Sequence, residues 1–146
     1  MNEKELLKQG WLKSKLWFEV LATGKEAAEQ SLKSHVEKLE KLEGVIVKEK
    51  NFEKVEEVKK LPLQFKKMGL KKAYSQVVET TVFTDSIEKL LLVVMVFGPS
   101  AIEVLEPKEM KISIGTVQTI MNSVADMMHR FASSGVGGII ISRGDK

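Results

Sequence analysis

The alternation of side chains in residues 15–23 predicts the first clear element, a β-strand. Leu16 and Phe18 lie at positions of one parity, and Trp17 and Leu21 lie at positions of the other. Successive side chains of a strand point to opposite faces of its sheet, so this spacing is typical of β structure. Both faces of the predicted strand therefore carry bulky apolar groups, and a face left without helices would need a cover.

Two other stretches follow the period of an amphipathic helix. In residues 25–44, Ala28, Leu32, Val36 and Leu39 recur at spacings of three or four, charged residues lie opposite, and Gly44 supplies a stop. Residues 113–135 repeat this pattern and predict a second long helix. Its apolar stripe consists of Ile114, Val117, Met121, Val124, Met128 and Phe131.

Residues 90–97 form a continuous apolar run that fits three interpretations: a membrane span, a buried strand or a buried helix. The run is too short to cross a bilayer as a helix, which takes about 20 residues. Its β-branched valines favour a strand. The spacing of Asp85 and Glu88 before the run, and the Gly98-Pro99 stop after it, favour a helix. We predict a helix, because these signals lie too far apart for a typical strand.

Three further strands are predicted from alternating or β-branched segments at residues 45–49, 73–84 and 101–107. The resulting order is that of an α+β, ferredoxin-like βαββαβ fold with an extra C-terminal helix. We expect a single domain over residues 1–146. A basic excursion at residues 51–72 is expected between the second and third strands, and a flexible tail at residues 135–146.

Residues 84–110 also carry a recognisable turn and strand, at Phe97, Gly98, Pro99, Glu103, Val104, Leu105, Glu106 and Pro107. This stretch resembles the ferredoxin-like C-terminal extension, called WCX, of WYL-domain transcriptional regulators. The resemblance implies a non-catalytic module for ligand sensing or self-association. The sequence shows no helix-turn-helix and no WYL motif, so a stand-alone archaeal-type family is the alternative.

The composition describes a soluble globular chain rather than a disordered one. The absence of cysteine excludes disulfides and Cys-ligated metals. The first ten residues do not read as a signal peptide, so we expect a cytoplasmic location. The abundance of Lys and Glu over Asn and Gln is typical of heat-adapted proteins.

The basic excursion contains the most unusual surface signal, a run of lysines without acidic residues at residues 59–72. Such a patch attracts phosphates, and its apolar neighbours could contact bases, lipid or protein. The alternative interpretation is a solvated loop whose apolar residues pack onto the domain. Nonspecific binding of RNA or another polyanion is therefore the second candidate function, carried by Lys59, Lys60, Lys66, Lys67, Lys71 and Lys72.

No residue pattern predicts catalysis, a metal site or a cofactor. His35 borders the apolar stripe of its helix, and His129 follows Asp126 by three residues, but neither helix supplies further metal ligands at the required spacing. The Gly-rich segment 135–138 lacks the ending of a phosphate loop, and the Arg-Gly-Asp tripeptide at residues 143–145 carries no weight. The methionines of the last helix are interpreted as core.

The leading function predicted from the sequence is a small non-catalytic binding or regulatory module. We expect a homo-oligomer, most simply a dimer, whose interface covers the open sheet face or includes the last helix. An anionic small molecule is the candidate ligand, because the turns before helices present free N–H groups. The residues at these two turns are Thr23 and Gly24, and Thr84 and Ser86.

Overall fold

The computed structural model describes residues 1–133 and divides the chain into two compact units. Met1–Glu109 form the first unit, which contains the sheet. Met110–Lys146 form the second, whose described part is dominated by helix α5 (Ile114–Ser133). The expectation of one domain over the whole chain stays a prediction. The predicted tail, with its Gly-rich segment and Arg-Gly-Asp tripeptide, lies outside the described residues.

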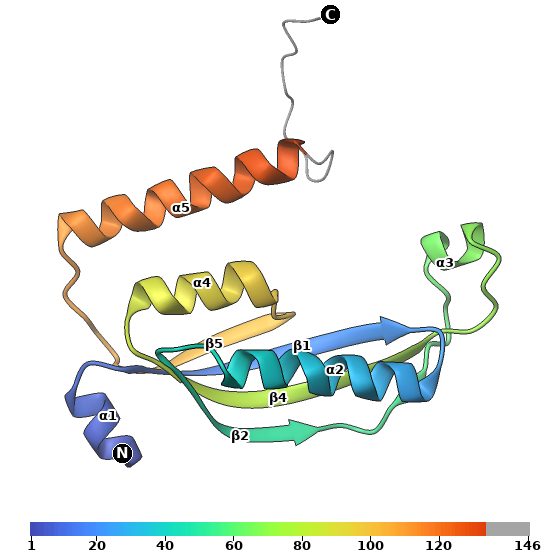
Figure 1. Cartoon of the computed structure of the whole chain (residues 1–146), viewed down its shortest axis with the longest axis horizontal. Helices are drawn as coiled ribbons and strands as arrows, with labels where there is room; N and C mark the ends of the chain where they lie inside the picture. The colour runs from blue at the N-terminus through green and yellow to red at the C-terminus, as the bar shows by residue number, and fades with distance from the viewer. Residues whose placement is uncertain (134–146) are drawn as a thin grey trace, which may run out of the picture. The chain divides into compact units, whose positions relative to one another are not determined.

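The first unit is built on an antiparallel sheet whose two long central strands are β1 (Leu12–Ala22) and β4 (Tyr74–Thr84). The order along the sheet is β2-β4-β1-β5, with β2 (Val45–Phe52) and β5 (Ala101–Glu106) outside (Figure 1). The short β3 (Glu56–Glu57) also pairs with β4. The α+β class predicted from the sequence is confirmed.

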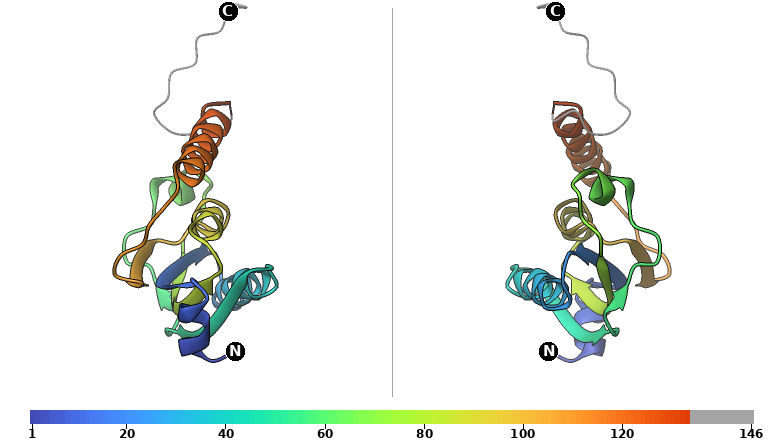
Figure 2. Two further views of the ribbon diagram at one scale, coloured as in Figure 1. Left: turned by 90° about the vertical axis from the view of Figure 1, so that its left-hand side faces the viewer. Right: turned by 90° about the vertical axis from the view of Figure 1, so that its right-hand side faces the viewer.

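Helices α2 (Lys25–Glu40) and α4 (Ile87–Phe97) cover one face of this sheet, as Figure 2 shows in views along the strands. The alternation predicted for β1 holds, because Leu16 and Phe18 point to this face and are buried. The apolar stripe predicted for α2 packs against them. The main core cluster consists of Leu16, Phe18, Leu32, Val36, Leu39, Val45, Val78, Val82 and Val93.

The apolar run at residues 90–97 is helical, as predicted, and forms most of α4. Its N-cap is Ser86 rather than Asp85: the Ser86 hydroxyl accepts a hydrogen bond of 3.1 Å from the Lys89 amide. Its C-cap is Gly98, at φ 57°, in the left-handed region that glycine adopts without steric cost. Helix formation prevails over the β-branched valines because both ends are capped and one side, with Leu90 and Val93, is buried, although Val96 stays 62% exposed.

The turn between α2 and β2 contacts the turn between β4 and α4. Helix α2 ends at Glu40, earlier than predicted, and Gly44 has a φ of 81°. The Gly44 carbonyl accepts a hydrogen bond of 3.0 Å from the Asp85 amide. A Cβ at position 44 would overlap the side-chain carboxylate of Asp85, and the positive φ is strained for other residues, so glycine is favoured where these turns meet.

The sequence patterns did not predict helix α1 (Glu3–Lys8), which covers one end of the sheet face opposite α2 and α4. Lys13 lies directly across from Phe83 on that face, and its ammonium group pairs with the carboxylate of Glu3 in α1. The hydrogen bond from Lys13 to Glu3 raises the pKa of the lysine. Leu6 and Phe83 are both fully buried.

The rest of this second face is more polar than the sequence suggested. Trp17 is half-buried and Leu21 exposed, as predicted for an open face, but the residue across from Trp17 on β4 is Glu79. Lys15 forms a 3.6 Å ion pair with Glu79 across two strands. Charged side chains therefore share this face with Trp17 and Leu21, so its need for a cover is smaller than the sequence indicated.

The two faces predict different costs for truncating leucines of the same strand. Leu16→Ala is expected to lower the free energy of unfolding by about 2–5 kcal/mol, because it leaves a cavity in the core. The control Leu21→Ala should change it by about 0.5 kcal/mol or less, since Leu21 is 45% exposed. Urea unfolding followed by circular dichroism measures both. Similar losses in the two variants would contradict the assignment of faces.

Candidate functional site

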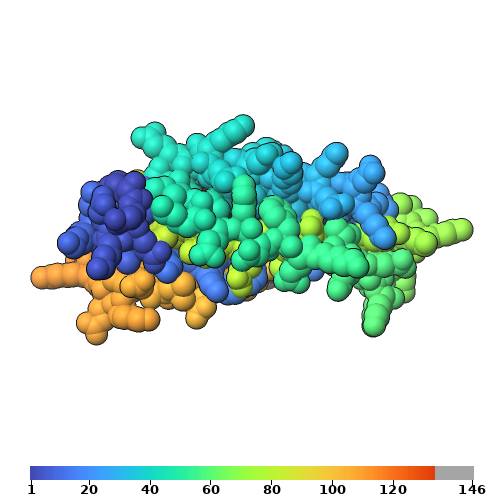
Figure 3. All heavy atoms as spheres, turned by 90° about the horizontal axis from the view of Figure 1, so that it is seen from below, coloured from blue at the N-terminus to red at the C-terminus, as the bar shows by residue number. Residues whose placement is uncertain are grey.

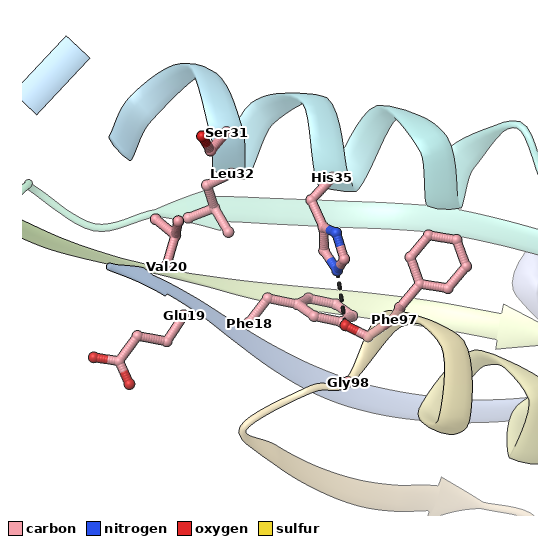
Figure 4. Close-up of a pocket in the computed structure, with 8 residues that line it drawn as sticks. All are labelled: Phe18, Glu19, Val20, Ser31, Leu32, His35, Phe97 and Gly98. Carbon is pink, nitrogen blue, oxygen red and sulfur yellow. Dashed lines mark hydrogen bonds between the residues drawn. The ribbon is translucent and has the colours of Figure 1, made fainter. Parts of the chain in front are cut away.

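Among the cavities of the first unit are a smaller one around His35 and a larger one beside Gln76. The smaller one has a volume of about 240 Å³ and is lined by residues from β1, α2 and the end of α4 (Figure 4). The His35 ring meets the rings of Phe18 and Phe97 edge-on, with centroid distances of 5.3 Å in each case. The remaining lining residues are Glu19, Val20, Ser31, Leu32 and Gly98.

The hydrogen bond of His35 decides what this cavity can do. Its Nε2 lies 2.8 Å from the carbonyl oxygen of Phe97, which can only accept, so Nε2 carries the proton. The acceptor is one of the carbonyls that the end of α4 leaves without a helical partner. The carboxylate of Glu19 points away from the imidazole (Figure 4). His35 therefore joins α2 to α4 and has no acid or base partner in this cavity.

The larger cavity, about 330 Å³, lies between α2 and the strands β2 and β4. Gln76 of β4 is 6% exposed and donates a 2.9 Å hydrogen bond from Nε2 to the carbonyl of Glu53. Its carbonyl oxygen, Oε1, is buried and has no hydrogen-bond partner among the described residues. Glu29, Lys33, Val36, Lys50 and Phe52 complete the lining.

A β-bulge places the β2 residues of this cavity. The register pairs Val47 with Val82 but Glu49 with Thr81, so one extra residue lies between them. Because a strand alternates its side chains, the extra residue reverses which positions point to α2. Lys50 and Phe52 thereby join Val47 on the helix face. Unbroken alternation in this segment would have selected Glu49 and Asn51 instead.

The sequence-predicted ligand residues fall into two separate groups. Thr23 and Gly24 follow the end of β1, whereas Thr84 pairs with Leu12 at its start. An eleven-residue strand, about 36 Å at 3.3 Å per residue, separates them. Thr84 is fully buried, and the hydroxyl of Ser86 caps its own helix. The structure therefore does not combine these four residues into one site.

The lysines of the basic excursion all belong to one segment that projects from the sheet. The segment leaves the sheet beyond β3, where the Val58 amide donates to the Ala73 carbonyl at 2.8 Å, and it contains the short helix α3 (Leu63–Lys67). It forms a lobe, green in Figure 3, at the end of the sheet away from α1. None of its six lysines forms an ion pair among the described residues. All are exposed: Lys59, Lys60, Lys66, Lys67, Lys71 and Lys72.

The residues of α5 show no chemistry beyond an apolar stripe. His129 and Asp126 are exposed. Within residues 1–133, no three His, Cys, Asp or Glu side chains come together as a metal site. The methionines of the stripe, predicted as core, include Met121 at 60% exposure and Met128 at 43%. That interpretation is wrong for the single chain as described.

A family model, the MJ0538 family, matches residues 13–139. The chain belongs to the MJ0538 family. The match begins at the second residue of β1 and includes the rest of the sheet and α5, and it confirms the stand-alone family as the alternative to a WYL-type regulator. No curated protein and no solved structure matches the chain.

None of the helices in residues 1–133 combines the length and apolar composition needed to cross a membrane. The apolar run at residues 90–97 is part of an eleven-residue helix packed on the sheet. This finding agrees with the sequence-based rejection of a membrane span.

The role of His35 as a link between helices predicts a graded response to substitution. His35→Phe keeps a ring between Phe18 and Phe97 but loses the hydrogen bond, at a cost of about 1 kcal/mol. His35→Ala also loses both edge contacts, and should cost about 2–3 kcal/mol in total.

Urea unfolding of both variants and of the exposed control His129→Ala measures these costs. The control should remain within about 0.5 kcal/mol of the parent. Equal destabilisation by His35→Phe and His35→Ala would show that the ring contacts contribute nothing.

Proposed function

We propose that this protein is a small cytoplasmic, non-catalytic binding module that works as a homodimer, with α5 of each copy forming the interface. The supporting observation is the spacing of the α5 stripe, which runs 3-4-3-4-3 from Ile114 to Phe131. This is the spacing of the a and d positions of a coiled coil. A second copy of the same helix is self-complementary to such a stripe.

The positions flanking the stripe support the same partner. In the heptad register set by Ile114, the e and g positions within α5 are Gln118, Ile120, Ala125, Met127 and Ala132. None of these side chains carries a charge, so two copies of α5 would approach without like-charge repulsion. Met121, Val124 and Met128 are exposed in the single chain, and pairing would remove them from water.

The arrangement of the first unit supports a binding scaffold. We infer that it is ferredoxin-like: without α1, β3 and α3, its elements follow the order βαββαβ. The use of His35 Nε2 in a bond between two helices supports a non-catalytic role for that residue.

The dimer proposal is tested by neighbouring substitutions on α5. Met121→Glu places a charge at an a position and should convert a dimer of twice 16.4 kDa into a monomer at micromolar concentration. The control Asn122→Glu adds the same charge at an exposed position outside the stripe and should leave the mass unchanged. Light scattering after size exclusion gives both masses. A monomeric parent protein would overturn the proposal.

A second candidate function, binding of RNA or another polyanion, is favoured by the six exposed lysines of the lobe, which form no ion pair within residues 1–133. Each phosphate that a lysine neutralises releases counterions, so affinity should fall steeply with salt. Four to six contacts predict a log–log slope of roughly −3 to −5. Because Arg, which recognises bases by paired hydrogen bonds, is absent from the lobe, this binding would be independent of sequence.

Replacing all six lysines by Gln should abolish most of the salt-dependent affinity for a single-stranded RNA oligonucleotide, measured by fluorescence anisotropy. Thermal stability should stay nearly unchanged, because exposed lysines contribute little to folding. Gln substitutions at Lys38 and Lys41, exposed at the C-terminal end of α2 and outside the excursion, serve as the charge control. Equal RNA affinity of the six-site variant and the parent would eliminate this function.

A further inference from the structure

The unpaired carbonyl oxygen of Gln76 points to a ligand in the larger cavity. A buried acceptor without a hydrogen bond costs about 1–3 kcal/mol, so such atoms are rare in folded proteins. The Glu53 carbonyl fixes the orientation of the amide, because it can accept only from Nε2. Rotating the amide would turn two oxygens toward each other. Oε1 therefore keeps its position and needs a donor that the described residues do not supply.

The charges around the cavity indicate what else such a ligand carries. Lys50 is held by Glu40, with Nζ 2.9 and 3.1 Å from the two carboxylate oxygens. Glu29 and Lys33, one helical turn apart on α2, form no ion pair with each other or with any described residue. The cavity wall thus presents one unpaired carboxylate and one unpaired ammonium group, both open to a ligand.

Apolar groups form the remaining wall. Val36 is buried in the core, and Phe52 of β2 is 39% exposed. An aromatic ring exposed to this extent at a cavity gains from apolar contact. A purely anionic molecule would satisfy Lys33 but leave Gln76 without a donor and Phe52 without a partner.

We propose that this cavity binds a free α-amino acid with an apolar side chain. The ammonium group donates to Gln76 Oε1 and faces Glu29, the carboxylate pairs with Lys33, and the side chain packs against Phe52 and Val36. A cavity of about 330 Å³ accommodates a molecule of this size. The inference rests on the proposed binding module and deepens it, because it names the ligand class. It replaces the helix N-termini as the ligand site.

The test uses the full-length, ¹⁵N-labelled protein titrated with three compounds and followed by NMR. L-Leucine has both charges, N-acetyl-L-leucine lacks the ammonium group, and L-leucinamide lacks the carboxylate. Leucine up to about 10 mM should saturate a site with a Kd near 1 mM. It should shift the side-chain NH₂ signals of Gln76 and the amide signals of Lys33 and Phe52. Each blocked compound should bind about tenfold more weakly or worse.

A matched pair of variants locates the site. Lys33→Gln should weaken leucine binding about tenfold, whereas Lys38→Gln, exposed on the same helix but outside the cavity, should leave it unchanged. Both positions are exposed, so neither change should affect folding. Gln76→Leu should abolish binding; should this variant fail to fold, Lys33→Gln still decides the outcome.

The ligand assignment is overturned if leucine produces no saturable shifts, if all three compounds bind equally, or if Lys33→Gln binds like the parent. Light scattering on the same samples separates this result from the dimer proposal. A dimeric parent without leucine binding overturns only the ligand class. A monomeric parent that binds leucine upholds the ligand and overturns the dimer.

Discussion

The pairing of β1 with β4 is the constraint on which the rest of the first unit depends. The two strands match along their full length, from Leu12 opposite Thr84 to Ala22 opposite Tyr74, without a register shift. Since side chains alternate along each strand, this pairing places Leu16, Val78 and their neighbours on one face of the sheet. A slip by one residue would turn that entire apolar set to the opposite face. Burial of these apolar side chains therefore requires this register, and the register in turn determines which side chains are buried.

The helices add a second level of constraint, because they must cover the face that the ladder makes apolar. His35 contributes here by linking α2 to the last carbonyl of α4, and Gly44 contributes by letting two turns meet at Asp85. These contacts join segments far apart in the chain. They fix the separation of the two helices over the sheet, and with it the shape of the cavity around His35.

The larger cavity arises where regular pairing is interrupted. The bulge after Val47 turns Lys50 and Phe52 toward α2, and the chain between β2 and β3 brings the Glu53 carbonyl to Gln76. A bulge is a local cost to the ladder, and such irregularities are frequent next to functional sites. The lobe and α5 lie outside this framework. Substitutions on their exposed surfaces can therefore change binding without disturbing the core.

Local patterns were enough to identify α2, α5 and the four main strands by their side-chain pattern and α4 by the signals at its two ends, because these patterns depend only on neighbours in the chain. Helix α1 is too short to show a period, and its role became visible only through the contact between Glu3 and Lys13. Among the residues that line the larger cavity, only Val36 belongs to a pattern that the sequence showed, the apolar stripe of α2. In the sequence, Gln76 is an ordinary polar residue of a predicted strand. Unbroken alternation from Val47 would place Lys50 and Phe52 on the face away from α2. The bulge that reverses this depends on the register of β2 against β4, which is a non-local property. The sequence thus determined which segments form helices and strands, whereas the tertiary structure decided which side chains meet, since pairing partners, bulges and burial are set between distant segments.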